Sequence, residues 1–182
     1  MADTTDKDAH QGQRRLLLLR HAKSAWPDAV ADHERPLAER GEKAAPAMGN
    51  YMAREHLIPD LALVSDARRT RETWELVQRR LPAEVAKRID PTIYEAPADR
   101  LLDTIRALGD SAATLLLIGH NPGLQDLALM LIGDGDARAH DALAAKYPTA
   151  ALAVIDFPVA DWRQVGPGSG LLTRFVTPRS LR

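Results

Sequence analysis

Two histidines follow the two most apolar segments of the chain. Arg20 and His21 come directly after a run of four leucines, and His120 comes directly after the segment TLLLIG. Imidazole is the side chain best suited to acid–base and nucleophilic chemistry near neutral pH. The equivalent positions of His21 and His120 therefore make them candidates for one catalytic site.

Guanidinium groups accompany the histidines. Arg20 precedes His21, and the segment after a third apolar run contains Arg68 and Arg69. Positive charges gathered at one place repel one another unless an anion lies between them. Phosphate fits such a site best, because arginine binds its oxygens through two parallel hydrogen bonds. The residue types therefore predict a phosphate-binding site.

The segment Asn121-Pro122-Gly123 supports this interpretation. We expect a helix over residues 121–133, with Asn121 as its N-cap and Pro122 in its first turn. The free backbone N–H groups at that helix start and the positive end of its dipole would then face the same anion. Asn121 is therefore a further candidate phosphate-binding residue.

The usual phosphate-binding and nucleophilic motifs are missing from the sequence. It contains no G-x-x-x-x-G-K-[ST] loop and no carboxylate cluster that matches a magnesium site. The chain has no cysteine, which excludes cysteine nucleophiles and thiolate metal sites. His21 remains the candidate nucleophile, with no metal and no cofactor expected. Because an imidazole attacks only when it is unprotonated, we expect the rate to fall at acid pH.

The pattern of elements predicts an α/β fold. We expect strands at 15–19, 61–65, 114–119, 151–157 and 171–176, and helices at 37–56, 70–81, 98–109 and 121–133. This alternation is typical of a three-layer sandwich, with a mostly parallel central sheet, helices on both faces and a C-terminal antiparallel hairpin. Ligands of such sheets bind at the carboxyl ends of the strands, where the histidines and arginines fall. The acidic segment GDGDARAHD at 133–141 is interpreted as a surface loop.

Length and charge narrow the function classes. The 182 residues carry 24 Lys and Arg against 25 Asp and Glu, which does not favour nucleic-acid binding. No apolar run reaches the length of a membrane span. We expect a disordered tail over residues 1–13, one domain over residues 14–182, and a cytoplasmic monomer.

Three short blocks resemble the histidine phosphatase superfamily, which has the phosphoglycerate mutase-like fold. The family's Arg-His, its Ser-Arg-Thr series and its late Gly-His are matched by Arg20-His21, by Ser65, Arg69 and Thr73, and by Gly119-His120. The chain departs from the pattern at Ala22, where the family usually has glycine. Longer segments, among them RPLAERGEKAA and LLIGHNPGLQDLAL, resemble the SixA-like phosphohistidine phosphatase branch.

The resemblance implies a role for each matched residue. His21 would be the nucleophile, Arg20, Arg69 and His120 would bind phosphate, and no metal would take part. Arg68 is the alternative to Arg69 in this register. The nearest match to the family's acidic proton donor is Glu95, a glutamate in a loop segment.

The substrate class stays open at this point. An imidazole leaves phosphorus more easily than an alkoxide does, so a weak proton donor favours a phosphohistidine substrate carried by a protein. The alternatives are a small phosphorylated substrate, hydrolysed on the same fold as a phosphomonoester, and a phosphoprotein-binding module without catalytic activity.

Overall fold

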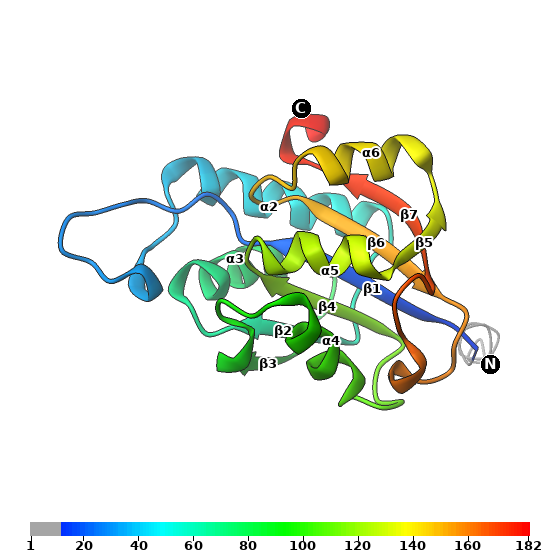
Figure 1. The fold of residues 1–182 in the computed structure, drawn as a ribbon. Helices are drawn as coiled ribbons and strands as arrows, with labels where there is room; N and C mark the ends of the chain where they lie inside the picture. Colours follow the sequence, from blue (N-terminus) through cyan, green and yellow to red (C-terminus); the bar gives the residue numbers. More distant parts are fainter. Residues whose placement is uncertain (1–11) are drawn as a thin grey trace, which may run out of the picture.

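The structure is a computed structural model that describes residues 12–182, and its seven strands form one sheet (Figure 1). The strands lie in the order β3-β2-β4-β1-β6-β7-β5. Their bounds are β1 Arg14–Arg20, β2 Leu61–Ser65, β3 Ala86–Asp90, β4 Thr114–Gly119, β5 Ile132–Gly135, β6 Leu152–Phe157 and β7 Gly170–Val176. Strand β6 is antiparallel to β1 and β7, whereas the other neighbouring pairs are parallel. The predicted mostly parallel sheet with a C-terminal antiparallel hairpin is confirmed.

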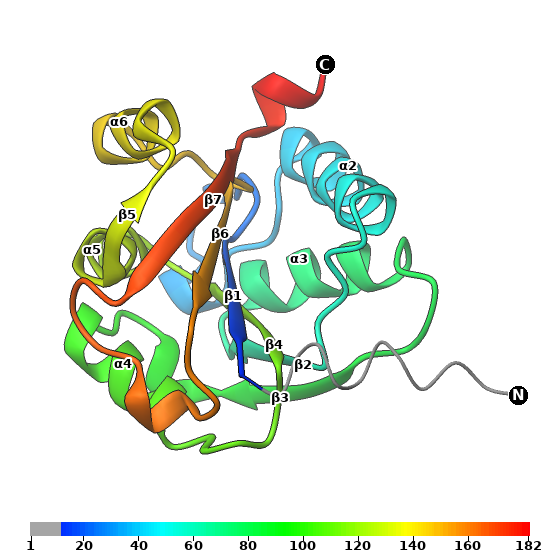
Figure 2. The same cartoon turned by 90° about the vertical axis from the view of Figure 1, so that its right-hand side faces the viewer.

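Helices cover both faces of the sheet, as Figure 2 shows. On one face lie α2 (Glu39–Arg54) and α3 (Arg68–Gln78), and on the other lie α4 (Ala98–Arg106), α5 (Gly123–Leu131) and α6 (Ala137–Ala145). Short 3-10 helices occur in the connections, namely η1 (Asp32–Glu34), η2 (Pro91–Ile93), η3 (Trp162–Gln164) and η4 (Pro178–Leu181). The three-layer architecture agrees with the sequence-based prediction.

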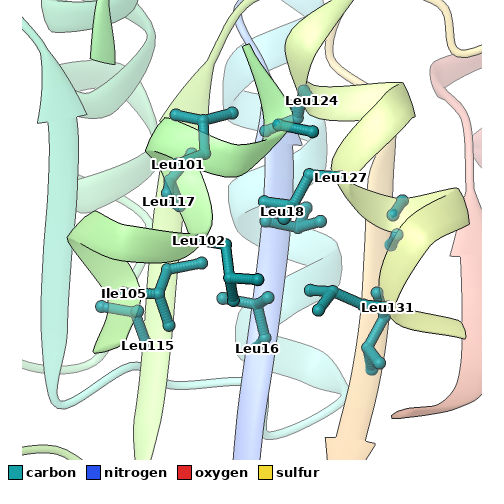
Figure 3. Packing of buried hydrophobic residues seen from close by; sticks show 14 of the residues in the cluster. Leu16, Leu18, Leu101, Leu102, Ile105, Leu115, Leu117, Leu124, Leu127 and Leu131 are labelled. Atoms are coloured by element: carbon teal, nitrogen blue, oxygen red, sulfur yellow. The ribbon is translucent and has the colours of Figure 1, made fainter. Parts of the chain in front are cut away.

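The leucine run of β1 is buried on both of its faces. Leu16 and Leu18 pack beneath α4 and α5 (Figure 3), whereas Leu17 and Leu19 belong to the core beneath α2 and α3. All four leucines are 0% exposed. Because successive side chains of a strand point to opposite faces, a central strand covered on both sides must be apolar throughout. This packing fixes the backbone up to the residue that precedes His21.

The four predicted helices are present with shorter bounds than expected. The helix predicted over 121–133 begins at Gly123, and its N-cap is Pro122 rather than Asn121. Pro46 lies inside α2. The helix predicted over 70–81 begins two residues earlier, at Arg68, so the arginine cluster forms its first turn.

The prediction of a surface loop over residues 133–141 is wrong. Part of this segment forms β5, which pairs with β7, and the rest forms the start of α6. The Asp136 carboxylate caps the helix by accepting a hydrogen bond from the Ala139 backbone N–H at 2.7 Å. Leu143, beyond the acidic stretch, is fully buried and anchors α6 to the core. Asp136 therefore serves as the helix cap, and one later leucine provides the packing.

Strand β3 was not expected from the sequence. Its residues are mostly exposed and include Lys87 and Arg88, so it has no apolar alternation. It pairs with β2 and forms an edge of the sheet, where charged side chains are common because they prevent pairing with other chains. Backbone pairing creates this strand, and side-chain pattern does not reveal it.

The predicted tail over residues 1–13 lies outside the described residues, apart from Gly12 and Gln13. Within residues 12–182, no helix combines the length and the apolar character needed to cross a bilayer.

The packing of β1 predicts a large cost for shortening one of its leucines. We expect Leu18→Ala to lower the free energy of unfolding by about 2–5 kcal/mol, because it leaves a cavity between the sheet and α5. Leu129→Ala is the matched control, since Leu129 lies on α5 but is 37% exposed. Urea unfolding of both variants measures the difference, and equal stabilities would contradict the packing described.

Candidate active site

The parallel pairing of β1 with β4 brings the two histidines together. Arg20 lies opposite Gly119 in the register, and the backbone N–H of His21 donates to the Gly119 carbonyl at 3.1 Å. Each histidine comes directly after its strand, so both side chains lie at the same edge of the sheet. Their ring centroids are 5.2 Å apart, and the residues are 7% and 8% exposed. The sequence-predicted histidines thus share one largely buried site.

The surroundings of His21 leave one ring nitrogen available for attack. Its Nδ1 lies 2.8 Å from the carbonyl oxygen of Ala22, and because a carbonyl only accepts, the Nδ1–H donates. The lone pair of the neutral ring is therefore on Nε2. Burial lowers the pKa of His21 to about 3, and repulsion by His120, Arg69 and Arg20 adds to this. The ring is therefore unprotonated at neutral pH.

His120 is held by a serine at the end of β2. Its Nε2 lies 2.8 Å from Oγ of Ser65. Burial, followed by the nearby Arg69, lowers the pKa of His120 to about 4, so this ring is also neutral at neutral pH. If the serine hydroxyl donates to Nε2, the single ring proton sits on Nδ1. These two histidines gain protons only near pH 3 to 4. The fall in rate that the sequence predicts at acid pH is therefore expected in that range.

The two candidate arginines of α3 have different surroundings. Arg69 is 6% exposed, and its two terminal nitrogens donate to the backbone carbonyl and the carboxylate of Asp32 at 2.7 and 3.1 Å. Arg68 is half-exposed, and its Nε donates to Glu72 at 2.7 Å. The structure therefore places Arg69 beside the histidines and Arg68 at the surface.

A single backbone carbonyl holds Arg20 and Asn121. The Tyr147 carbonyl accepts from a terminal nitrogen of Arg20 at 2.9 Å and from the Asn121 side-chain amide at 3.3 Å. Burial, together with the nearby Arg69, lowers the pKa of the Arg20 guanidinium. The amide nitrogen of Asn121 also lies 3.4 Å from the Gln125 side chain, so its hydrogens already have partners within the protein. In this geometry Asn121 holds the segment that also positions Arg20.

Three buried nitrogen atoms at this site lack a hydrogen-bond partner within the described part of the chain. They are Nε of Arg20, Nε of Arg69 and Nδ1 of His120. Buried polar atoms in folded proteins are nearly always paired, so unpartnered donors need an explanation. Two guanidiniums and one imidazole with free donors are suited to bind the oxygens of an anion.

Asp32 is the counter-ion of the cluster, and the sequence analysis did not identify it. Its carboxylate accepts from the Tyr94 hydroxyl at 2.5 Å and from Arg35 at 2.9 Å, in addition to Arg69. These bonds, above all the one from Tyr94, hold the pKa of Asp32 well below its usual range. Asp32 therefore stays ionised at neutral pH. The only available signal was the charge balance, because several buried cations require a carboxylate nearby.

Ala22 fits the position that glycine usually occupies in the family. It is fully buried and is not among the residues of 12–182 with positive φ, so a methyl group is tolerated there. Its backbone N–H donates to Oγ1 of Thr73 at 2.9 Å, and the Thr73 hydroxyl donates to the Arg69 carbonyl at 2.7 Å. Thr73 therefore links the loop after His21 to the helix that carries Arg69.

A cavity of about 520 Å³ adjoins the cluster. Its lining consists of Asp32, Arg69, Glu95, Ala96, Pro97, His120, Asn121, Pro122, Gly123 and Asp126. His21 and Arg20 are not part of this lining, and the ring of His21 lies 5.2 Å from that of His120, which is part of it. Glu95 is exposed, and its backbone φ of 54° is an angle that residues other than glycine rarely adopt. The backbone thus holds Glu95 at the cavity in an uncommon conformation.

The described residues offer little for a metal ion. No group of three or more His, Cys, Asp or Glu side chains among residues 12–182 is arranged to hold one.

The chain belongs to the histidine phosphatase superfamily. Residues 16–96 match the model of branch 1 of that superfamily. An uncharacterised protein of Mycobacterium tuberculosis is 37% identical over 163 residues, which cover 88% of this chain and 100% of the relative.

Within the superfamily, the chain is a SixA-like phosphatase. The crystal structure of a proposed phosphohistidine phosphatase SixA from Agrobacterium tumefaciens has a TM-score of 0.77 and 31% identity, and covers 91% of this chain and 98% of its own. The structure of a proposed phosphohistidine phosphatase SixA from Nakamurella multipartitia has a TM-score of 0.76 and 30% identity, and covers 92% of this chain and 97% of its own. The phosphate-binding interpretation of the sequence is consistent with this family.

The lowered pKa of the buried histidines predicts acid sensitivity of the fold. The unfolded chain protonates His21 near its ordinary pKa of 6.5, whereas the folded chain does so only near 3. Below pH 6.5 the unfolded state therefore binds more protons, and stability falls as pH falls, by about 1.4 kcal/mol per pH unit for one such group. We expect His21→Asn to reduce the slope of unfolding free energy between pH 6.5 and 5.

His140→Asn is the matched control for this measurement. His140 lies on the surface of α6 with a side chain 42% exposed, so its replacement should leave the slope unchanged. Urea unfolding at several pH values gives both slopes. A wild-type slope in His21→Asn would show that His21 is not held neutral by burial.

Proposed function

We propose that this phosphatase removes phosphate from phosphohistidine in a protein, through a covalent phosphohistidine on His21 and without a metal ion. The observation that carries the proposal is the hydrogen bond from Nδ1 of His21 to the Ala22 carbonyl, which leaves the lone pair on Nε2. An unprotonated imidazole nitrogen beside free anion-binding donors is what nucleophilic attack on phosphorus requires.

The reaction has two displacement steps. In the first, Nε2 of His21 forms a bond to phosphorus, the phosphorus–nitrogen bond of the substrate breaks, and the departing imidazole takes up a proton. In the second, a water oxygen forms a bond to phosphorus and the bond to Nε2 breaks, while one proton of the water returns to the carboxylate that protonated the imidazole and the other stays on the phosphate. The products are the dephosphorylated histidine and inorganic phosphate, and His21 returns to its neutral form.

Arg20, Arg69 and His120 bind the phosphoryl oxygens in this proposal. Their unpartnered donors, Nε in each arginine and Nδ1 in His120, would supply hydrogen bonds that strengthen as charge develops on those oxygens. The side chain of Asn121 acts on the Tyr147 carbonyl, so any phosphate contact from Asn121 would need a rearrangement of that amide.

Glu95 is the proposed proton donor for the leaving group. Two other carboxyl groups, Asp32 and Asp126, line the same cavity. Asp32 is unsuited to the role because its hydrogen bonds keep it ionised at neutral pH. Glu95 is exposed at the cavity, where an arriving substrate would meet it. A donor that accessible suits a leaving group that needs little help, as imidazole does.

Similarity to the two SixA structures, which are described as phosphohistidine phosphatases, supports a phosphohistidine substrate, and the alternative is a small phosphomonoester. The cytoplasmic location and the monomeric state expected from the sequence remain predictions.

Trapping the covalent intermediate tests the nucleophile. With a labelled phosphohistidine peptide and rapid quenching, we expect the wild type to carry an acid-labile label and His21→Ala to carry none. His140→Ala should be labelled like the wild type, because His140 lies on α6 at the surface. Label on His21→Ala would refute the assignment, and faster turnover of a phosphoserine peptide would favour the phosphomonoesterase.

The two neighbouring arginines provide a matched pair of variants. We expect Arg69→Ala to lower kcat/KM by about 10²–10³-fold, the loss typical of one removed oxyanion donor. Arg68→Ala should change it little, because Arg68 pairs with Glu72 at the surface. Steady-state kinetics on the phosphohistidine peptide measure both, with thermal unfolding as a check on folding. Equal losses would contradict the role of Arg69.

A further inference from the structure

A second cavity, of about 650 Å³, lies beside the active site and has a strongly basic lining. Its charged lining residues are all positive, namely Lys23, Arg40, Lys43, Lys146, Arg179 and Arg182. The chain as a whole has slightly more acidic than basic residues, so this cluster does not reflect a general excess of positive charge. We call these residues and the cavity they surround the basic groove.

The topology places the basic groove at the same edge of the sheet as His21. Strand β7 is antiparallel to β6, which is antiparallel to β1, so β1 and β7 end at the same edge. Lys23 follows His21 by two residues, and η4 with Arg179 follows β7. Figures 1 and 2 show η4 on the same side of the molecule as α6 and next to α2.

One segment separates the basic groove from the active site. Lys146, Pro148 and Thr149 line the groove, and the carbonyl of Tyr147 between them holds Arg20 of the active site. A chain lying in the groove would therefore pass directly beside the catalytic cluster.

Most of the positive charges of the groove are not neutralised by the protein. Within residues 12–182, Lys43 pairs with Glu39 at 2.6 Å, and the other five have no ion-pair partner. All six side chains are exposed, and the five without an ion-pair partner can bind another molecule. Like charges gathered around a concave surface raise its potential and attract anions.

We propose that the basic groove binds an acidic polypeptide segment of the phosphoprotein substrate, next to the phosphohistidine that enters the active site. This inference rests on the proposed function. It adds to that function a preference for acidic residues around the phosphohistidine of the substrate.

The groove favours a polypeptide over other polyanions. Its lining includes Ala44, Ala47, Phe175 and Leu181, so apolar side chains can bind between the cations. Single-stranded nucleic acids are bound by basic surfaces with several exposed aromatic rings, whereas Phe175 is the groove's one aromatic residue and is partly buried. A membrane surface would contact a projecting face, and this surface is concave.

Reversal of two groove charges tests the proposal. The double variant Arg40→Glu and Arg179→Glu changes exposed residues, and a glutamate in the first turn of α2 is compatible with the helix dipole. The matched control is Lys87→Glu with Arg88→Glu, which makes the same charge change on the exposed edge strand β3.

Binding is measured first, without any reaction. We expect a fluorescent, unphosphorylated Asp- and Glu-rich peptide to bind the wild type and the control, with an affinity that falls as salt rises. The groove variant should bind it roughly tenfold more weakly or worse. Equal binding by the two variants would overturn the proposal. Tighter groove-dependent binding of single-stranded DNA or of anionic lipid vesicles would overturn the choice of a polypeptide.

Activity measurements then separate this proposal from the proposed function. With a phosphohistidine peptide that has acidic flanks, the groove variant should show a raised KM, and with free phosphohistidine it should match the wild type. Loss of both activities would place these residues in the catalytic site and refute docking. Peptide binding without hydrolysis of any phosphohistidine substrate would refute the proposed function but leave the groove assignment in place.

Discussion

The parallel pairing of β1 with β4 is the constraint on which the active site depends. Both strands are buried on both faces, so their leucines and isoleucine prevent either strand from shifting against the other. A shift of one residue would turn every side chain to the opposite face, and the two cores would lose their packing. The register in turn sets the distance between the two imidazole rings. The positions of these candidate catalytic groups are therefore a consequence of core packing.

Electrostatics at this edge follow from burial. Two imidazoles and two guanidiniums could not stay close together if all four were charged and unpaired. Burial lowers the pKa of both histidines, so they remain neutral, and Asp32 offsets the charge of Arg69. The same burial that makes His21 unprotonated also removes water from the unpartnered nitrogens of Arg20, Arg69 and His120. Burial therefore explains both the low charge of the cluster and the unprotonated ring that the proposed attack requires.

Different loops at this edge of the sheet carry the residues of the candidate site and those of the basic groove. The loop after β1 carries His21 and, further on, Asp32, which returns to bind Arg69 at the start of α3. The segment before β6 holds Arg20 through the Tyr147 carbonyl and lies between the catalytic cluster and the basic groove. Chemistry and the proposed substrate recognition are thus connected through one short stretch of backbone.

The fold class and the placement of Arg20, His21 and His120 at one edge of the sheet could be predicted from the sequence alone, because uninterrupted apolar runs mark buried central strands and the residues after parallel strands share one edge. Tertiary structure alone decided that Arg69 rather than Arg68 faces the histidines, which depends on which side of α3 is buried. It also revealed Asp32, the proton position on His21 and the strands β3 and β5. These features rest on contacts between residues far apart in the chain or on backbone hydrogen bonds, and neither leaves a periodic pattern in the sequence.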